Sequence, residues 1–323
     1  MNIIIPKYEI IEQSYGDDLL KDMYKHIEKC GRTCYKSEDK ITDTSYQKFV
    51  KMLTDSEHGA MLEHGTVYLW IEYGKDRNQS HRIEKYLNNP YVKYRNIYDN
   101  YFITTNYRVM VENGWLDDLK YMCKPTEHHE KRYTVKFTYH LAVARDINRH
   151  RVQSIGEEST RYCNYSKDKF GNELNIAKPT WISEGEYAYK SYDLLSYCYD
   201  IVQNKYKDEF NDIDYWLFSN LANEFSYMNL IRLGWTPQKA SLVLPLDTKT
   251  ESVHTAFASD WCHFFNLRAL GTTGAPRPSA KEVAWPLMEE FIKRGYIDEE
   301  QIDRNRYKEI LEKYKNIEDY FKV

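Results

Sequence analysis

The chain has 323 residues, of which 42% are hydrophobic and 29% are charged, and its formal net charge is −4 at pH 7. A chain of this length forms one large domain or two ordinary ones and can bury a sizeable core. The slightly acidic balance gives no general attraction to nucleic acid or to an anionic membrane, so any anion-binding site must be built locally.

The first third of the chain contains two predicted helices, a loop and a strand. Apolar residues recur at helical spacing over residues 18–29 and 43–54. The segment HGAMLEH (58–64) is predicted to be a loop. It leads into TVYLWIEY (66–73), which is rich in β-branched and aromatic residues and is therefore predicted to be a strand.

A second strand is predicted over YTVKFTYHLAV (133–143), and residues 75–131 are predicted to be an insertion between the two strands, which are expected to pair. The next segment, LAVARDINRHR (141–151), reads as a helix, and residues 187–233 read as largely helical. Helical spacing also predicts a helix over residues 251–268. A polar terminal helix is predicted for residues 300–323.

Helices and strands do not alternate regularly along the chain, which predicts an α+β fold rather than a doubly wound sheet. No repeat or low-complexity linker divides the sequence, so residues 1–323 are predicted to form a single domain. No apolar run is long enough to cross a membrane, and the first residues lack the features of a signal peptide. We therefore predict a cytoplasmic protein.

The sequence RHRVQSIGEESTRY, called the charged segment below (residues 149–162), concentrates three arginines, a histidine and two adjacent glutamates. Serine hydroxyls, backbone N–H groups and arginine forks are the groups that bind phosphate. An equally simple interpretation is a solvated helix end in which Arg149 pairs with Glu157 or Glu158. The residue pattern alone leaves both interpretations open.

A second candidate site lies in FFNLRALGTTGAP, where Arg268 extends an apolar helical stripe. An arginine in that position either reaches out to water or lies in a partly dry pocket, where it needs an anionic partner. His263, five residues earlier, is expected beside the stripe. The alternative interpretation of His263 is a half-buried histidine that makes an ordinary hydrogen bond.

Several other kinds of site are not supported by the sequence. There is no Gly-rich Walker loop, no G-x-G-x-x-G after a strand and no H-E-x-x-H pattern. His58 and His64 are too isolated to predict a metal site. Cys30 and Cys34 have no second pair downstream, so the six cysteines are predicted to be free thiols in a reducing compartment.

The charged segment resembles the signature of the flavin-dependent thymidylate synthases, and its continuation CNYSK is similar to one branch of that family. The resemblance extends from about residue 30 to about residue 290. Five further segments resemble family segments and follow in family order: GRTCYKSE (31–38), HGAMLEH (58–64), TNYRVMVENG (105–114), VLPLDTKTE (243–251) and HFFNLRALGTTGAP (263–276).

The resemblance implies an α+β fold in which helices wrap a central, mostly antiparallel sheet. It also implies a homotetramer whose active sites are shared between subunits. The implied reaction methylates C5 of dUMP to give dTMP, with methylenetetrahydrofolate as the carbon donor and NADPH as the reductant of a bound FAD. The chain also contains 30 tyrosines, and this abundance indicates AT-rich coding DNA, as in a low-GC bacterium or a virus.

The resemblance also implies roles for individual residues. Arg268 is the implied catalytic residue, because a fixed guanidinium at the N3/O4 edge of uracil stabilises negative charge there. The residues implied to bind dUMP are Asp146, Arg149, Glu157, Ser159, Thr160, Arg161 and Arg268. The residues implied to bind FAD are Glu63, Arg149, His150, Arg151, Glu157, His263 and Arg277. No metal is implied.

Some positions depart from the family pattern, namely Asp146, Gly156, Ser241, Arg277 and Ser279. Ser241 stands where an arginine usually helps to hold dUMP, and Lys239 is the nearest substitute. A second hypothesis is therefore a related flavin-dependent enzyme that acts on another pyrimidine nucleotide or leaves a hydroxymethyl group. A third, a nucleotide- or nucleic-acid-binding protein without catalysis, is disfavoured by the net charge.

Overall fold

The computed structural model describes residues 1–72, 83–182, 202–203 and 210–323, and its centre is a four-stranded antiparallel sheet. The strand order is β2-β6-β9-β7. The bounds are Lys7–Ile11 for β2, Arg132–His140 for β6, Ser154–Glu157 for β7 and Lys249–Phe257 for β9. Two shorter strands, β1 (Asn2–Ile4) and β8 (Asn175–Ala177), form a separate parallel pair. The predicted α+β class with an antiparallel central sheet is confirmed.

Strand β9 corrects the predicted helix over residues 251–268. The chain remains extended as far as Phe257, and only the helix α10 (Ala258–Arg268) follows the prediction. β9 lies between β6 and β7 and is buried along most of its length, so its side chains do not show the alternation that marks a half-exposed strand. The aromatic residues after Phe257 recur at helical spacing, and for this reason the predicted helix also included the residues of β9.

A second sheet of three antiparallel strands has the order β3-β5-β4. Its strands are β3 (Thr66–Glu72), β4 (Lys93–Ile97) and β5 (Asn100–Asn106). The predicted strand at 66–73 is thus confirmed, but its predicted pairing with β6 is wrong. Tyr98 and Asp99 both have positive φ, which suits a tight two-residue hairpin turn, and this hairpin supplies β3 with a nearer partner.

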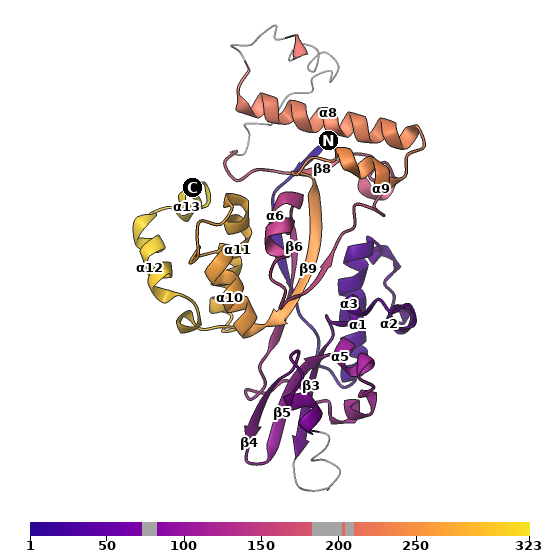
Figure 1. Ribbon diagram of the computed structural model, residues 1–323, viewed down its shortest axis with the longest axis vertical. Helices are drawn as coiled ribbons and strands as arrows, with labels where there is room; N and C mark the ends of the chain where they lie inside the picture. The colour runs from indigo at the N-terminus through magenta and orange to yellow at the C-terminus, as the bar shows by residue number, and fades with distance from the viewer. Residues whose placement is uncertain (73–82, 183–201, 204–209) are drawn as a thin grey trace.

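Helices cover both faces of the central sheet (Figure 1). On one side, α10, α11 (Pro278–Lys293), α12 (Arg304–Lys313) and α13 (Ile317–Phe321) pack on buried aromatic residues of β6 such as Phe137. On the other side lie α1 (Leu19–Tyr35), α2 (Ser45–Asp55) and α3 (Gly59–Leu62). The predicted wrapping of the sheet by helices is confirmed.

Other boundaries refine the predictions. The predicted helices at 18–29 and 43–54 are α1 and α2, the predicted loop at 58–64 contains the single turn α3, and the terminal segment 300–323 forms two helices rather than one. Of the predicted helical region 187–233, residues 187–201 and 204–209 lie outside the described residues, and the remainder contains α8 (Asp212–Arg232). Two further helices are short: α5 (Tyr107–Glu112) and α9 (Pro237–Ala240).

Two further findings concern the described part of the chain. None of its helices is long and apolar enough to cross a membrane. No group of three His, Cys, Asp or Glu side chains in the same residues is arranged to hold a metal ion. The five cysteines in this part are free thiols, and burial raises the pKa of the Cys30 and Cys34 thiols, the latter to about 12.

Candidate active site

The charged segment begins beyond the end of a helix rather than within one. Helix α6 (Leu141–Ile147) stops two residues before Arg149, so the predicted helix over residues 141–151 is too long. The backbone then turns, with the N–H groups of His150 and Gln153 bonding to the carbonyls of Ile147 and His150, and enters β7. This turn places the side chains of residues 149–153 at the end of α6, next to the central sheet.

Both glutamates of the charged segment point toward the protein interior. The Glu157 carboxylate accepts hydrogen bonds from Asn148 Nδ2 at 2.6 Å and from Thr250 Oγ1 at 3.2 Å. Glu158 is buried and accepts a bond from Lys249 Nζ at 2.9 Å. Neither carboxylate pairs with Arg149, so the interpretation of the segment as an internally paired helix end is wrong.

The three arginines of the charged segment are left exposed. Arg149, Arg151 and Arg161 form no ion pair with any residue that the structure describes. Ser154, one of the serines of the segment, is buried and accepts a bond from Arg132 at 3.1 Å, so its hydroxyl is not offered to a ligand. The segment therefore separates its charges, with carboxylates inside and guanidinium groups available to an anion.

Arg268 lies at the end of α10 and is held by two protein acceptors. Its Nε donates to His150 Nε2 at 2.9 Å, and its Nη2 donates to the backbone carbonyl of Asp146 at 2.7 Å. Burial, and then the Arg268 charge, lower the pKa of His150 to about 4, so the ring is neutral near pH 7 and carries its proton on Nδ1. Nη1 has no partner among the described residues and can reach a ligand.

Asp146 joins this cluster to the loop after α10. Its carboxylate accepts from Arg277 Nε at 2.7 Å while its carbonyl holds Arg268. His263 is exposed on α10, with its ring centre 6.0 Å from that of His150. The structure thus brings together Asp146, His150, His263, Arg268 and Arg277, which the sequence assigned to one site from separate segments.

A cavity of about 440 Å³ lies beside the turn of the charged segment. Glu63, Arg108, Arg151 and Gln153 are among its lining residues. Glu63 pairs with Arg108 at 2.6 Å, and the buried Nε2 of Gln153 has no partner. A buried amide without a partner, next to guanidinium groups, is the donor set that an anionic ligand with many hydrogen-bonding atoms would satisfy. Arg108 is already paired with Glu63 and Glu112, so Arg151 and the Gln153 amide are the groups here that suit the anionic part of an implied flavin nucleotide.

The Ser159–Thr160–Arg161 turn follows β7. The Ser159 Oγ accepts from the Arg161 backbone N–H at 3.3 Å, and the Arg161 guanidinium makes one long contact of 3.4 Å with Gln238 of α9. Ser241, at the end of α9, bonds to the Gln238 carbonyl, and Lys239 is exposed on the same short helix. The residues of α9 therefore lie next to the turn that is expected to hold phosphate.

Gly156 is in close contact with its neighbours, which explains its departure from the family pattern. A Cβ at this position would lie 2.6 Å from Cys34 Sγ and 2.8 Å from Met61 Cε. The space that a side chain would need is filled by α1 and α3. A larger side chain at position 156 would therefore require Cys34 or Met61 to shift.

We expect Gly156→Asn to lower the free energy of unfolding by about 1–3 kcal/mol, because the new side chain overpacks a filled interior. Urea denaturation followed by circular dichroism measures the change. The matched control is Gly114→Asn, where φ is +67°, nothing lies within 4 Å and asparagine tolerates the conformation. Equal stability of the Gly156 variant and the wild type would contradict the packing explanation.

The sequence did not reveal a lysine–glutamate network behind β7. Glu251 pairs with Lys249 at 3.1 Å, with Lys136 at 2.7 Å and with Lys36. Burial raises the pKa of Glu251, but the charges of Lys249 and Lys36 outweigh burial and lower it to about 2. The sequence signal for this network was the pair of charged residues at 249 and 251. The helix predicted over residues 251–268 obscured that these two residues share one face of a strand.

This network should make stability depend on pH. Because the pKa of Glu251 is lower in the folded state, its contribution is complete above about pH 4.5 and declines as the pH falls toward 2. We expect Glu251→Gln to destabilise the protein at pH 7, and the difference from wild type to shrink as the pH falls below 4.5. Urea denaturation at several pH values measures this. Parallel curves would contradict it, and the exposed Glu309→Gln serves as the control.

A buried chain of polar side chains was also missed. His64 Nδ1 bonds to Thr255 Oγ1 at 2.8 Å, Thr255 bonds to Thr134 at 2.7 Å, and Thr134 bonds to His26 Nε2 at 3.0 Å. Burial lowers the pKa of both histidines, to about 3 for His26. These residues link α1 and the end of α3 to the central sheet, so they position the HGAMLEH segment.

Comparisons with known proteins identify the family to which the chain belongs. The family model described as thymidylate synthase complementing protein matches residues 118–294, more than half of the chain, so the chain belongs to this family. No curated protein matches it. The solved structures that are similar include the UMP/dUMP methylase PolB from Streptomyces cacaoi bound with 5-Br dUMP, with 16% identity, a TM-score of 0.38, and coverage of 91% of this chain and 93% of that one. The same enzyme bound with 5-Br UMP gives 16% identity, a TM-score of 0.38, and coverage of 90% and 91%.

Proposed function

We propose that this protein methylates C5 of dUMP to give dTMP, with methylenetetrahydrofolate as the carbon donor and FAD reduced by NADPH. Membership of the thymidylate synthase complementing family supports the class of reaction. The observation that carries the proposal is the separation of charge in the charged segment. Its glutamates bond inside the protein, whereas Arg149, Arg151 and Arg161 have no carboxylate partner among the described residues.

Arg268 is the proposed catalytic residue. Two of its nitrogens are fixed by His150 and Asp146, so the free Nη1 is held in one direction. A guanidinium preorganised in this way stabilises negative charge on the N3/O4 side of uracil and makes C5 a better nucleophile, without reorganisation during the reaction. Since His150 stays neutral, it accepts from Arg268 and adds no competing positive charge.

The proposed nucleotide site joins Arg268 to the turn after β7. Ser159, Thr160 and Arg161 would hold the phosphate of dUMP, because hydroxyls and a guanidinium suit a phosphate dianion. Asp146, Arg149 and Glu157 would complete the site. Burial raises the pKa of Glu157, but hydrogen bonds from Asn148 and Thr250 oppose this effect and fix the carboxylate.

FAD would bind across the 440 Å³ cavity and the end of α10. Glu63 and Arg151 line that cavity, whereas Arg149, His150, His263 and Arg277 lie at or near the Arg268 cluster. When bound, FAD supplies the reducing equivalents taken from NADPH. Glu157 is the proposed link between the flavin and nucleotide groups. A homotetramer with shared active sites and a cytoplasmic location, in a bacterium or a virus-infected cell, belong to the same proposal.

The second hypothesis, another pyrimidine nucleotide or a hydroxymethyl product, depended on the departures at Asp146, Gly156 and Ser241. Each of these residues has a local contact: Asp146 pairs with Arg277, Gly156 is packed against Cys34, and Ser241 bonds to Gln238. No contact of these residues favours a different base, so this hypothesis remains the alternative that product analysis must exclude.

The absorption spectrum of the purified protein tests the proposal. We expect a yellow protein, or one that becomes yellow with added FAD, whose flavin absorbance bleaches when NADPH is added without oxygen. A protein that stays colourless after incubation with FAD would contradict the flavin-dependent reaction.

A further inference from the structure

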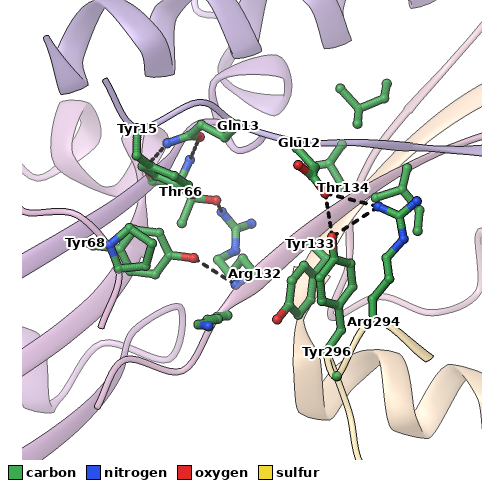
Figure 2. A pocket seen from close by; sticks show the side chains of 15 residues that line it. Glu12, Gln13, Tyr15, Thr66, Tyr68, Arg132, Tyr133, Thr134, Arg294 and Tyr296 are labelled. Carbon is green, nitrogen blue, oxygen red and sulfur yellow. Dashed lines mark hydrogen bonds and ion pairs between the residues drawn. The ribbon is translucent and has the colours of Figure 1, made fainter. Parts of the chain in front are cut away.

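A cavity of about 300 Å³, called the tyrosine cavity below, is lined by none of the residues assigned to dUMP or FAD. It is bounded by β2 and the residues that follow it, by the beginnings of β3 and β6, and by the loop after α11 (Figure 2). Four tyrosines line it, with Arg132 between them: Tyr15, Tyr68, Tyr133 and Tyr296. None of these residues is used by the proposed methylation.

Arg132 is a buried cation that forms no ion pair within the described part of the chain. Its side chain donates only to neutral oxygens: the Glu63 carbonyl at 3.1 Å, Thr66 Oγ1 at 3.3 Å and Ser154 Oγ at 3.1 Å. The residue is 8% exposed, and no carboxylate among the described residues forms an ion pair with it. A buried charge without an opposite charge is costly, so an anion beside Arg132 would be strongly favoured.

The rest of the cavity also favours an anion. Its charged lining residues are Glu12, Lys131, Arg132 and Arg294, so three basic groups face one acidic group. Glu12 is already engaged by Arg294 at 3.2 Å and by the Tyr296 hydroxyl at 2.6 Å, across the cavity from the Arg132 side chain (Figure 2). The basic surplus therefore remains at Arg132 and Lys131.

The walls between these charges combine aromatic rings with polar groups in about equal measure. Burial raises the pKa of Tyr15, Tyr68 and Tyr133, so these phenols are neutral near pH 7. Ile10 and Pro125 add apolar surface. Such walls suit a flat apolar body better than a fully hydrated inorganic ion.

We propose that the tyrosine cavity is a second ligand site, which binds a small organic acid with one carboxylate on a flat apolar body. The carboxylate pairs with Arg132, and the body packs among the tyrosines. The site is independent of the proposed methylation, so either assignment can fail without the other.

Calorimetric titration of the full-length protein with benzoate tests this site, with benzamide as the neutral isostere. We expect one benzoate per chain, bound about 10-fold or more tightly than benzamide, because the neutral amide cannot form an ion pair with Arg132. Arg132→Gln should reduce benzoate affinity about 10-fold or more. The matched control, Arg95→Gln on the exposed surface of β4, should bind as the wild type does.

Tyr15→Trp keeps Arg132 and fills the cavity, so it tests the site even if Arg132→Gln does not fold. We expect this variant, with the circular dichroism of the wild type, to lose benzoate binding. Equal affinities for benzoate and benzamide would overturn the proposal, as would full benzoate binding by Tyr15→Trp. Inorganic phosphate that displaces benzoate with equal affinity would also overturn it, since it would show a site for any anion.

Discussion

Arg268→Ala is expected to lower the rate of dTMP formation at saturating dUMP by about 10²- to 10³-fold, while FAD stays bound. The reason is that Arg268 alone offers a fixed, partly buried guanidinium with a free nitrogen at the end of α10. Its removal deletes charge stabilisation that the transition state needs more than the ground state does. The rate is measured by separating the nucleotides, and the bound flavin by its absorbance.

Arg232→Ala is the control, because this exposed arginine of α8 bonds only to Asn229 one turn away. We expect it to keep the wild-type rate. Turnover by Arg268→Ala within a few-fold of the wild type would show that the arginine is not the catalytic residue. Loss of flavin from the same variant would instead assign it to cofactor binding.

Arg161→Ala is expected to raise the KM for dUMP by roughly 10- to 100-fold and to change kcat little, because a phosphate contact stabilises substrate and transition state alike. Among the described residues the guanidinium makes one long hydrogen bond, to Gln238, and lies over the Tyr162 ring, so no carboxylate there competes with a phosphate for it. Initial rates over a range of dUMP concentrations measure both constants.

Lys239→Ala distinguishes Arg161 from the other cation near this turn. Lys239 is exposed on α9, beside the serine that replaces the family arginine. We expect a smaller rise in KM than for Arg161→Ala, because the lysine ammonium is a point charge and cannot make the bidentate contact of a guanidinium. If the KM of Arg161→Ala equals that of the wild type, the phosphate lies elsewhere.

The resemblance named residues that the structure brings together, but it did not predict how their side chains are held. The resemblance assigned Asp146 and Arg268 to the dUMP site and His150 to the FAD site, and the structure places Arg268 in contact with both of the other residues. What could not be predicted was the direction of each side chain. Glu157 and Glu158 bond inside the protein because β7 pairs with β9, a strand that helical spacing had concealed.

The fold was predicted in class and in several elements, but not in strand pairing. Strand β3 was expected beside β6 because the intervening residues showed no clear pattern, and the hairpin of β4 and β5 took that place. Long-range contacts such as Arg132 with Ser154 leave no local sequence signal. For the same reason the tyrosine cavity and its buried cation could be found only in three dimensions.

The central claim is the conversion of dUMP to dTMP, and mass spectrometry of the nucleotide product tests it most directly. The protein is incubated with FAD, NADPH, methylenetetrahydrofolate and either dUMP or dCMP. We predict dTMP from dUMP and no modified product from dCMP. A hydroxymethyl nucleotide, a product from dCMP alone or unchanged dUMP in the presence of reduced flavin would contradict the account.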